Sequence, residues 1–369
     1  MDEILEVQTP QYFKNKSLMK SQYKTVLLLV ISLMYFSCTT QNQKDSIEIN
    51  LHDNKSLLSV SDITDSISSI VLEFTSKSVI GRIDQIIKDD SLLFVLDKQQ
   101  NTLFKFSLKG DYLGKIHNIG RAAGEFLELS TIAVDRNNKV IFLMDNLQRK
   151  MLKYQYDGAL IEEVANLDYY CRNLCILENG NLLMLNPDYN AYGMDGVWET
   201  NRNGEIERAI SEVHSKYKFT WLVYPAFSDY ENTISYYDIY SNVVYTLAGS
   251  VPTPMFSFNL KQFLPLKYLK SEYGVEFGKG TGHYYVNNGI AETNNTFLLK
   301  YYSNVTGSSH VLFSKSTKKA SILNSCAEEP NQKEHEIYSF DSNTLVRIIT
   351  PVETNKNPLL ELWHVKTDL

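Results

Sequence analysis

The sequence predicts an all-β fold, a six-bladed β-propeller with four antiparallel strands in each blade. Short runs rich in β-branched and aromatic residues recur roughly every 50 residues, a period typical of propellers. Each run follows a polar pair typical of a turn, as at Asn179-Gly180, and helical periodicity is not sustained along the body of the chain. The six runs are 92–97, 140–145, 182–187, 233–238, 296–301 and 344–349.

Each run is interpreted as the second strand, B, of a blade whose strands A to D follow one another along the chain. Gly110, Gly158 and Gly204 occupy corresponding turn positions between strands C and D of the first three units. The strands expected in the first unit are 85–88, 92–97, 102–107 and 112–117, and those in the second are 131–135, 140–145, 151–155 and 160–165.

The last unit lacks a fourth strand of its own. Its strands B and C fall at 344–349 and 359–365, and the sequence then ends at Leu369. A blade with an open edge would expose a row of unpaired backbone groups. The run 69–74, which precedes the first unit, is therefore expected to pair with 359–365 and to close the ring.

The first 37 residues are interpreted as a non-native extension followed by a lipoprotein signal peptide. Residues 1–18 contain acidic residues and no apolar run, so Met19 is the expected natural start. The apolar run at 26–36 is shorter than the ~20 residues of a membrane-spanning helix. Ser37-Cys38 resembles the cleavage motif of bacterial lipoproteins, so Cys38 is expected to be lipidated; ordinary cleavage and an unprocessed helix are the alternatives.

These assignments divide the chain into three regions. Residues 1–37 are removed, 38–68 form the lipidated cysteine and a polar tether, and 69–369 form the propeller. The protein is expected at the cell envelope, as a monomer held to the outer membrane by its lipid, facing the periplasm or the cell surface. The triplets around Ser46 and Ser66 also resemble a bacterial O-glycosylation pattern, although three-residue matches are common by chance.

Neither the charge nor the cysteines indicate a nucleic acid, a metal or a cofactor. The net charge of −7 argues against a polyanionic partner. On one extended strand Cys171 and Cys175 would lie ~13 Å apart, too far for a disulfide, so these two and Cys326 are expected to be buried thiols. The sequence has no nucleophile elbow, zinc-protease motif or P-loop, and the glycine-rich run 278–282 is typical of a loop between blades.

Three segments resemble a known family. They are 70–74, 80–83 and 119–126, the last of which reads Ile-Gly-Arg-Ala-Ala-Gly-Glu-Phe. Residues 69–369 resemble the six-bladed β-propeller lipoproteins of Gram-negative gut-type bacteria, which are related to NHL-repeat propellers. Ala122 and Ala123 stand where that family has Gly and Pro, which affects the local turn and not the fold. The resemblance implies the fold and export, because the family has no common activity.

Candidate binding residues lie in the connections from D to the next A and from B to C, which share one face of a propeller. Gly120 and Gly124 bracket a sharp turn that is expected to direct Arg121 and Glu125 to the channel mouth. An Arg121–Glu125 ion pair that only fastens the loop is the alternative. The candidate ligand-binding residues are Arg121, Glu125, Tyr189, Tyr192, Trp221, His283 and Tyr284.

Aromatic side chains with a few charged groups suit stacking on sugars or gripping a partner protein, and packing between blades is the alternative for each of them. The expected function is a binding or scaffolding module of an exported envelope lipoprotein, for a glycan or an envelope protein. The alternative is an exported hydrolase or lyase that acts on polysaccharide. Paired carboxylates, or His with carboxylates, at the channel mouth would favour the enzyme, and a mouth without such pairs would favour binding.

The segment 188–199 partly matches a calcium-binding loop. Asp188, Asn190, Gly193 and Glu199 occupy positions one, three, six and twelve of that pattern, but Tyr192 replaces the oxygen ligand at position five. The flanking residues are typical of strands and not of helices. A plain polar loop is therefore the favoured interpretation, and no metal is predicted.

Overall fold

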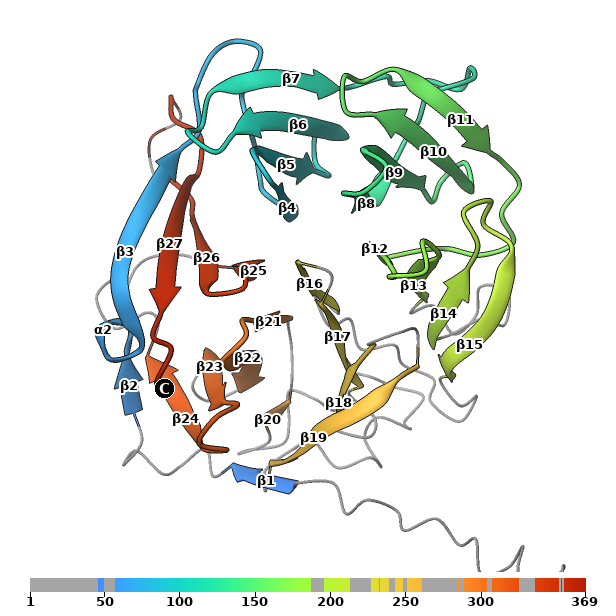
Figure 1. Cartoon of the computed structure of the whole chain (residues 1–369). Helices are drawn as coiled ribbons and strands as arrows, with labels where there is room; N and C mark the ends of the chain where they lie inside the picture. The colour runs from blue at the N-terminus through green and yellow to red at the C-terminus, as the bar shows by residue number, and fades with distance from the viewer. Residues whose placement is uncertain are drawn as a thin grey trace, which may run out of the picture. The chain divides into compact units, whose positions relative to one another are not determined.

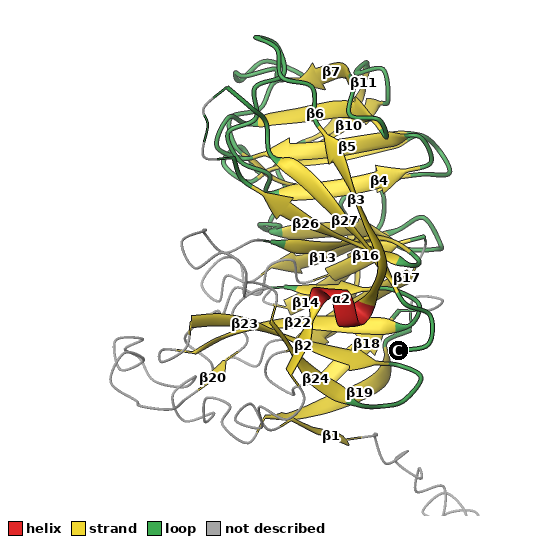
Figure 2. Ribbon diagram, turned by 90° about the vertical axis from the view of Figure 1, so that its left-hand side faces the viewer, coloured by secondary structure: helices red, strands yellow, loops and turns green. Residues whose placement is uncertain are grey.

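The structure is a computed structural model that describes residues 46–49, 57–186, 196–212, 227–231, 233–238, 243–247, 251–260, 284–285, 289–303, 307–324, 336–351, 353 and 355–369. All of them lie in the compact unit Asp45–Leu369. They form six blades of antiparallel strands around a central axis, which confirms the predicted fold (Figure 1). Apart from the short helix α2 (Val60–Ile63), the described residues are strands and loops (Figure 2). No helix among them is long and apolar enough to cross a membrane.

The first three blades each consist of four strands that are consecutive in the chain, running from the inner strand to the outer one. Blade 1 contains β4 (Gln85–Asp89), β5 (Leu92–Asp97), β6 (Thr102–Ser107) and β7 (Tyr112–Ile116). Blade 2 contains β8 (Leu129–Asp135), β9 (Val140–Asp145), β10 (Lys150–Gln155) and β11 (Leu160–Val164). Blade 3 contains β12 (Asn173–Ile176), β13 (Leu182–Asn186), β14 (Gly196–Thr200) and β15 (Ile206–Glu212).

The other three blades incorporate strands from the N-terminal part of the chain. Blade 4 contains β16 (Phe227–Tyr230), β17 (Thr233–Asp238), β18 (Val243–Thr246) and β19 (Thr253–Leu260). Blade 5 contains β21 (Ile290–Glu292), β22 (Thr296–Ser303), β23 (Gly307–Ser314) and β24 (Ala320–Asn324), and β20 (Tyr284–Tyr285) extends it beside β22. Blade 6 contains β25 (Ile337–Asp341), β26 (Thr344–Ile349), β27 (Leu359–Val365) and β3 (Thr64–Val71).

The N-terminal strand β3 completes blade 6, as predicted. It pairs antiparallel with β27, with Val71 opposite Leu359 and Thr64 opposite Val365. The strand begins five residues earlier than the predicted run 69–74 and ends at Val71. Six of its eight residues are exposed, and its first half has no strand-like side-chain pattern; backbone pairing with β27 defines this strand.

Two further strands precede β3 on the rim of the propeller. β1 (Ser46–Ile49) pairs in parallel with β19 of blade 4, and β2 (Leu57–Ser59) pairs in parallel with β24 of blade 5. The described parts of 46–71 therefore follow the outer edges of blades 4, 5 and 6 in turn (Figure 1). The polar composition of 38–68 predicts a tether, whereas the described parts of this segment include strands.

The core lies between the blades, because each sheet buries both of its faces. In β5, Leu93 and Val95 pack toward blade 6, while Phe94 and Leu96 pack toward blade 2. Each fully buried side chain of this kind contributes ~1.5–3 kcal/mol. This two-sided burial explains why second strands such as β5 and β9 are continuous apolar runs. β5, β9, β17 and β26 have the predicted bounds, whereas β13 ends at Asn186 and β22 continues to Ser303.

The cysteines of blade 3 are buried thiols, as predicted. Cys171 and Cys175 are both free. Burial raises the pKa of the Cys171 thiol to about 12 and raises that of Cys175 as well, so neither is a reactive thiolate. Cys326 and Cys38 lie outside the described residues.

Candidate functional site

A small polar cavity lies on the axis where the inner strands begin. The space open to the centre of a water molecule is about 40 Å³, enough for a few waters. Blades 1, 3, 4, 5 and 6 line it, and its polar side chains include Asp84, Asn173, Ser228, Asp229 and Ser339. The cavity therefore accepts a single functional group and not a sugar ring.

Blade 2 contributes none of the lining residues. Gln85 of β4, which does line the cavity, is hydrogen-bonded to the inner strand of blade 2. The Gln85 amide donates to the carbonyl oxygen of Ile132 at 2.8 Å and accepts from the Ile132 backbone N–H at 3.0 Å. Thr131 donates its hydroxyl to the same amide oxygen at 3.1 Å. These bonds hold the inner strands of blades 1 and 2 together beside the cavity.

An ion pair links Asp229, which lines the cavity, to blade 2. Arg136, in the turn between β8 and β9, reaches Asp229 of β16 with a distance of 3.0 Å between Nη1 and Oδ1. The Asp229 carboxylate holds the pKa of Arg136 above its usual value. The Arg136 Nε also donates to the carbonyl oxygen of Lys88 at 3.3 Å, which links three blades at this end.

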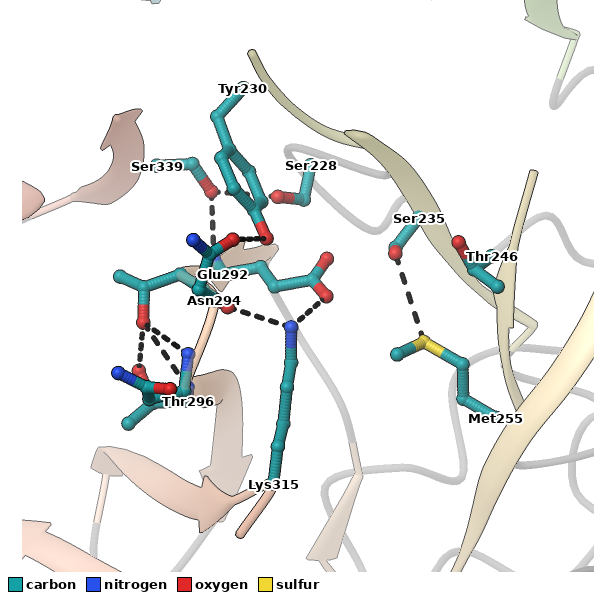
Figure 3. A network of polar contacts seen from close by, with 12 residues as sticks. Ser228, Tyr230, Ser235, Thr246, Met255, Glu292, Asn294, Thr296, Lys315 and Ser339 are labelled. Atoms are coloured by element: carbon teal, nitrogen blue, oxygen red, sulfur yellow. Dashed lines mark hydrogen bonds and ion pairs between the residues drawn. The ribbon is translucent and has the colours of Figure 1, made fainter. Parts of the chain in front are cut away.

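A polar network joins the inner strands of blades 4, 5 and 6 on the same side (Figure 3). Ser228 and Ser339 share a hydrogen bond of 2.7 Å, and Ser339 Oγ also accepts from the Glu292 backbone N–H at 2.7 Å. The Glu292 carboxylate is fully buried and forms an ion pair with Lys315, whose Nζ donates to the Thr293 carbonyl oxygen at 2.7 Å. We call the end of the axis at which the inner strands begin the mouth.

Asp97 holds two connections of blade 1 in place. One is the segment that leads into β4, and the other is the turn between β5 and β6. Asp97 Oδ2 accepts from the backbone N–H groups of Gly81 and Arg82 at 2.7 and 3.2 Å, and its Oδ1 accepts from that of Gln100 at 3.0 Å. The same arrangement recurs in blade 2 at Asp145. This carboxylate brings Arg82 close to Lys98, the residue that follows Asp97.

Four charged residues form a group at the mouth, which we call the mouth cluster: Arg82, Asp84, Lys98 and Arg172. Asp84 Oδ1 pairs with Arg82 Nη2 at 2.6 Å, and Oδ2 accepts from the Lys98 backbone N–H at 2.8 Å. Arg172 stands immediately before β12 in blade 3 and is exposed. Both oxygens of Asp84 are therefore engaged, and the buried Asp97 carboxylate also interacts electrostatically with Arg82.

Lys98 is the most perturbed group of the cluster. Burial lowers the pKa of its ammonium to about 8, the nearby Asp84 opposes this change, and Arg172 and Arg82 lower it further. The Lys98 side chain is partly buried. Perturbed titratable groups are common at binding and catalytic sites, although structural ion-pair networks perturb pKa values as well.

The carboxylates that line the cavity are already paired. Asp84 and Asp229 each form an ion pair with an arginine. Within the described ranges, no three His, Cys, Asp or Glu residues are grouped so that they could hold a metal ion. The arrangement is suited to binding through charge and hydrogen bonds, and it offers no pair of free carboxylates for acid–base chemistry.

The predicted residues Arg121 and Glu125 lie in a well-fastened loop. Glu125 Oε2 accepts from the Ala122 backbone N–H at 2.8 Å, and this side chain lies so close to Gly120 that any Cβ there would collide with it. No Arg121–Glu125 ion pair is found in the part of the chain that the structure describes, where the Arg121 side chain is exposed.

The surroundings of this loop differ from the expectation. Gly124 donates its N–H to Glu163 of β11 at 2.8 Å and accepts from the Tyr154 hydroxyl of β10 at 2.6 Å. The loop is therefore fastened to the two outer strands of blade 2, whereas the sequence analysis expected Arg121 and Glu125 at the channel mouth. Gly120 and Gly124 correctly indicated a sharp turn. They do not indicate how far from the propeller axis that turn lies.

The other predicted residues have no described side chains. Tyr189, Tyr192, Trp221 and His283 lie outside the described residues, and Tyr284 is placed only as part of β20. Most of the calcium-loop segment also lies outside, but Glu199 is described. Its Oε1 accepts from Asn179 and Asn181 at 2.9 and 2.7 Å, and its Oε2 pairs with Arg208 at 2.7 Å, so the carboxylate is fully engaged.

The sequence analysis missed the mouth cluster. Its members come from the start of blade 1, from the connection after β5 and from the start of blade 3. The repeated Asp-x-x-Gln spacing at Asp97 and Asp145 is a signal that could have located this face, because each Asp holds a connection there. The charged residues next to Asp97 would then have been candidates.

Comparisons with known proteins support the fold. A family model described as a domain of unknown function (DUF4934) matches residues 45–361. An exported protein of Bacteroides fragilis, so described, has a similar structure with a TM-score of 0.74 at 18% identity, over 87% of this chain and 100% of that chain. A member of the DUF4221 family from Bacteroides vulgatus has a TM-score of 0.52 at 10% identity, over 82% and 97% of the two chains.

A virginiamycin B lyase from Staphylococcus aureus is similar with a TM-score of 0.48 at 11% identity, over 81% of this chain and 99% of that chain. This likeness is too low to support any argument about activity. None of the curated proteins matches this chain in sequence. At the identities observed, the solved structures support the propeller fold and nothing beyond it.

Proposed function

The chain belongs to the DUF4934 family, whose model spans residues 45–361, and from this premise we propose that it is an envelope lipoprotein that binds a ligand at the mouth of its propeller. The ligand is a glycan or an envelope protein, and the lipid on Cys38 holds the domain at the outer membrane. The observation that carries the proposal is the mouth cluster, whose Asp84 also lines the cavity on the propeller axis.

Binding accounts for this geometry better than catalysis does. Ligand sites are concave and present a small number of fixed polar groups, as the mouth does. Glycosidic cleavage needs two carboxylates of which one is protonated, and Asp84 and Asp229 are both paired with arginine. No feature of the described residues favours the hydrolase or lyase alternative.

The N-terminal strands support the proposed anchoring. If Cys38 carries the lipid, eight residues at up to ~3.5 Å each connect it to Ser46 of β1, so the start of β1 lies within ~28 Å of the membrane. β1 is held on the outer edge of blade 4. The rim of the propeller, and not its mouth, is then tied closest to the lipid, which leaves the mouth accessible to a ligand.

The proposal is tested by a binding screen with the full-length protein in detergent. Glycans and envelope extracts are screened against the wild type, the mouth variant Arg172→Glu and the control Lys319→Glu. Lys319 is an exposed residue in the turn between β23 and β24, on the opposite face. We expect a ligand that the wild type and the control bind and the mouth variant does not. Binding that survives Arg172→Glu unchanged would place the site elsewhere.

A further inference from the structure

We propose that a pocket between blades 1 and 2 binds a small organic carboxylate, which the ammonium group of Lys105 holds. The two blades lie next to each other in the ring (Figure 1). Strands β5, β6 and β7 line the pocket, together with Ile141 of β9 and the turn between β10 and β11. The pocket shares no lining residue with the cavity on the axis, so this inference goes beyond the proposed function.

The neighbouring blade shows what the position of Lys105 lacks. Lys105 is the fourth residue of β6, and Lys153 is the fourth residue of β10. Lys153 lies opposite Glu162 of β11 and forms an ion pair with it at 2.5 Å, whereas Lys105 lies opposite Gly114 of β7. The register shifts directly after each of these two pairs, so the positions correspond. Blade 1 therefore lacks the carboxylate that blade 2 supplies.

Blade 3 has an ion pair at the same position with the charges exchanged. Glu199 of β14 lies opposite Arg208 of β15 and pairs with it at 2.7 Å, and the register again shifts directly after it. Blades 2 and 3 thus each join their two outer strands by an ion pair here. A carboxylate bound beside Lys105 would restore the corresponding pair in blade 1.

Gly114 leaves space for such a carboxylate. A Cβ atom on Gly114 would meet no other atom within 4 Å. The pocket offers about 110 Å³ to the centre of a water molecule. An apolar cavity of ~150 Å³ accepts a benzene ring. The pocket therefore has room for a carboxylate with a body no larger than one six-membered ring.

Lys105 retains hydrogen-bond donors for this ligand. Its Nζ donates to the Tyr156 carbonyl oxygen at 2.6 Å, and it forms no ion pair within the described part of the chain. An ammonium group has three N–H donors, so two of them are left. Hydrogen bonds between an ammonium and a carboxylate are about twice as strong as those between neutral groups. Lys115, which also lines the pocket, adds a second positive charge.

The carboxylates near the pocket do not take the place of Glu162. Asp157, in the lining, accepts from the Ala159 backbone N–H at 2.9 Å and pairs with no cation among the described residues. Asp89 accepts from the Tyr156 hydroxyl at 2.7 Å and pairs with Lys139 at 3.0 Å. Asp157 disfavours a second negative charge on the ligand, so a monocarboxylate is expected.

Apolar side chains define the body of the ligand. Leu113, Ile116 and Ile141 all line the pocket. Ile116 and Ile141 are buried, while Leu113 is 48% exposed at the surface. A ligand with an apolar body removes part of this surface from water, which favours binding. The class of ligand is therefore a small monocarboxylate with an apolar body.

The test is calorimetric titration of the full-length protein in detergent with benzoate and with benzamide, its neutral match in shape. Detergent alone is the blank. We expect the wild type to bind benzoate at pH 7, and to bind benzamide at least tenfold more weakly. No binding of benzoate, or equal affinity for the two probes, would overturn the inference.

Lys105→Met removes the ammonium group and should lower benzoate affinity at least tenfold. Lys153→Met, at the corresponding position of blade 2, is the matched control and should bind benzoate as the wild type does. Melting temperatures show whether both variants are folded. Unchanged benzoate affinity in folded Lys105→Met would also overturn the inference.

A second pair of variants decides the question even if Lys105→Met does not fold. Leu113→Glu adds a negative charge to the lining, and Ile161→Glu adds one at the corresponding position of blade 2. Leu113 and Ile161 are exposed to similar extents, 48% and 47%. We expect Leu113→Glu to bind benzoate at least tenfold more weakly and Ile161→Glu to bind it normally. Equal benzoate affinity in the two variants would show that the site is not in this pocket.

Discussion

Arg136 and Asp229 form an ion pair of 3.0 Å that joins blade 2 to blade 4 across the propeller axis, past the inner strand of blade 3. Both side chains are mostly shielded from solvent, at 19% and 15% exposure. Asp229 also lines the cavity on the propeller axis.

Replacement of Arg136 by Met should destabilise the protein by leaving Asp229 without its cation. Removal of one partner of a buried pair costs about 3–5 kcal/mol, and partial exposure reduces the expected loss to about 2 kcal/mol. Urea unfolding measures it. The double variant Arg136→Met, Asp229→Leu should recover most of the loss; if it is as unstable as the single variant, the ion pair is not the cause.

Lys315→Met should be more destabilising than Arg136→Met. Glu292 is fully buried, so removal of its Lys315 partner leaves an uncompensated charge, at a cost of about 3–5 kcal/mol. Addition of Glu292→Gln removes that charge and should restore most of the stability in the same unfolding assay. No difference between the single and the double variant would show that packing, and not charge, is responsible.

Ile70→Ala should weaken the whole ring and not one edge of it. Ile70 is a buried residue of β3, and it packs in the core between blades 6 and 1. Truncation of a buried Ile costs about 2–5 kcal/mol. Calorimetry should show a single transition at lower temperature. Two transitions, with only one displaced, would mean that the closing strand does not couple the blades.

Lys98 should make the stability depend on pH. Its folded pKa of about 8 lies below the ordinary value of 10.5, so the unfolded chain binds more protons between these values and stability rises with pH there. Lys98→Met lacks this contribution. The difference in unfolding free energy, variant minus wild type, should therefore be more positive at pH 7.5 than at pH 10. An equal difference at both values would contradict the lowered pKa.

Cys38→Ala should abolish lipidation. The apolar run before Ser37-Cys38 predicts a diacylated cysteine. Cells that express the wild type should incorporate a fatty-acid probe into the protein, and cells that express the variant should not. Thr40→Ser, outside the Ser37-Cys38 motif, serves as a conservative control. Equal labelling of Cys38→Ala and the wild type would refute the assignment.

The strands of the blades could be predicted from the sequence because their buried side chains leave a visible apolar pattern. β5 and β9 bury every residue after the first and follow turn-forming pairs, so both their type and their bounds are visible in the sequence. β1 and β2 are attached to blade edges by backbone pairing, which leaves no comparable pattern of side chains. Such strands cannot be recognised before their partners are known.

The mouth cluster could not be predicted for a different reason. Lys98 and Arg172 belong to blades 1 and 3, and only the closure of the ring brings their charges together. Arg121 was favoured because its neighbouring glycines indicate a turn, which the structure has on the outer side of blade 2. Local turn chemistry is visible in a sequence, but distance from the propeller axis is not.

The pairing of β3 with β27 also affects how the protein folds. The two strands lie at opposite ends of the folded part of the chain, so their contacts have nearly the largest sequence separation that the domain allows. Contacts of this kind slow folding, because the chain loses entropy before they form. Residues 64–71 must therefore wait, unpaired, until residues 359–365 have been synthesised. During this interval β3 is available to other strands, so folding of the complete ring is expected to depend on the protein being kept from aggregation until its last strand arrives.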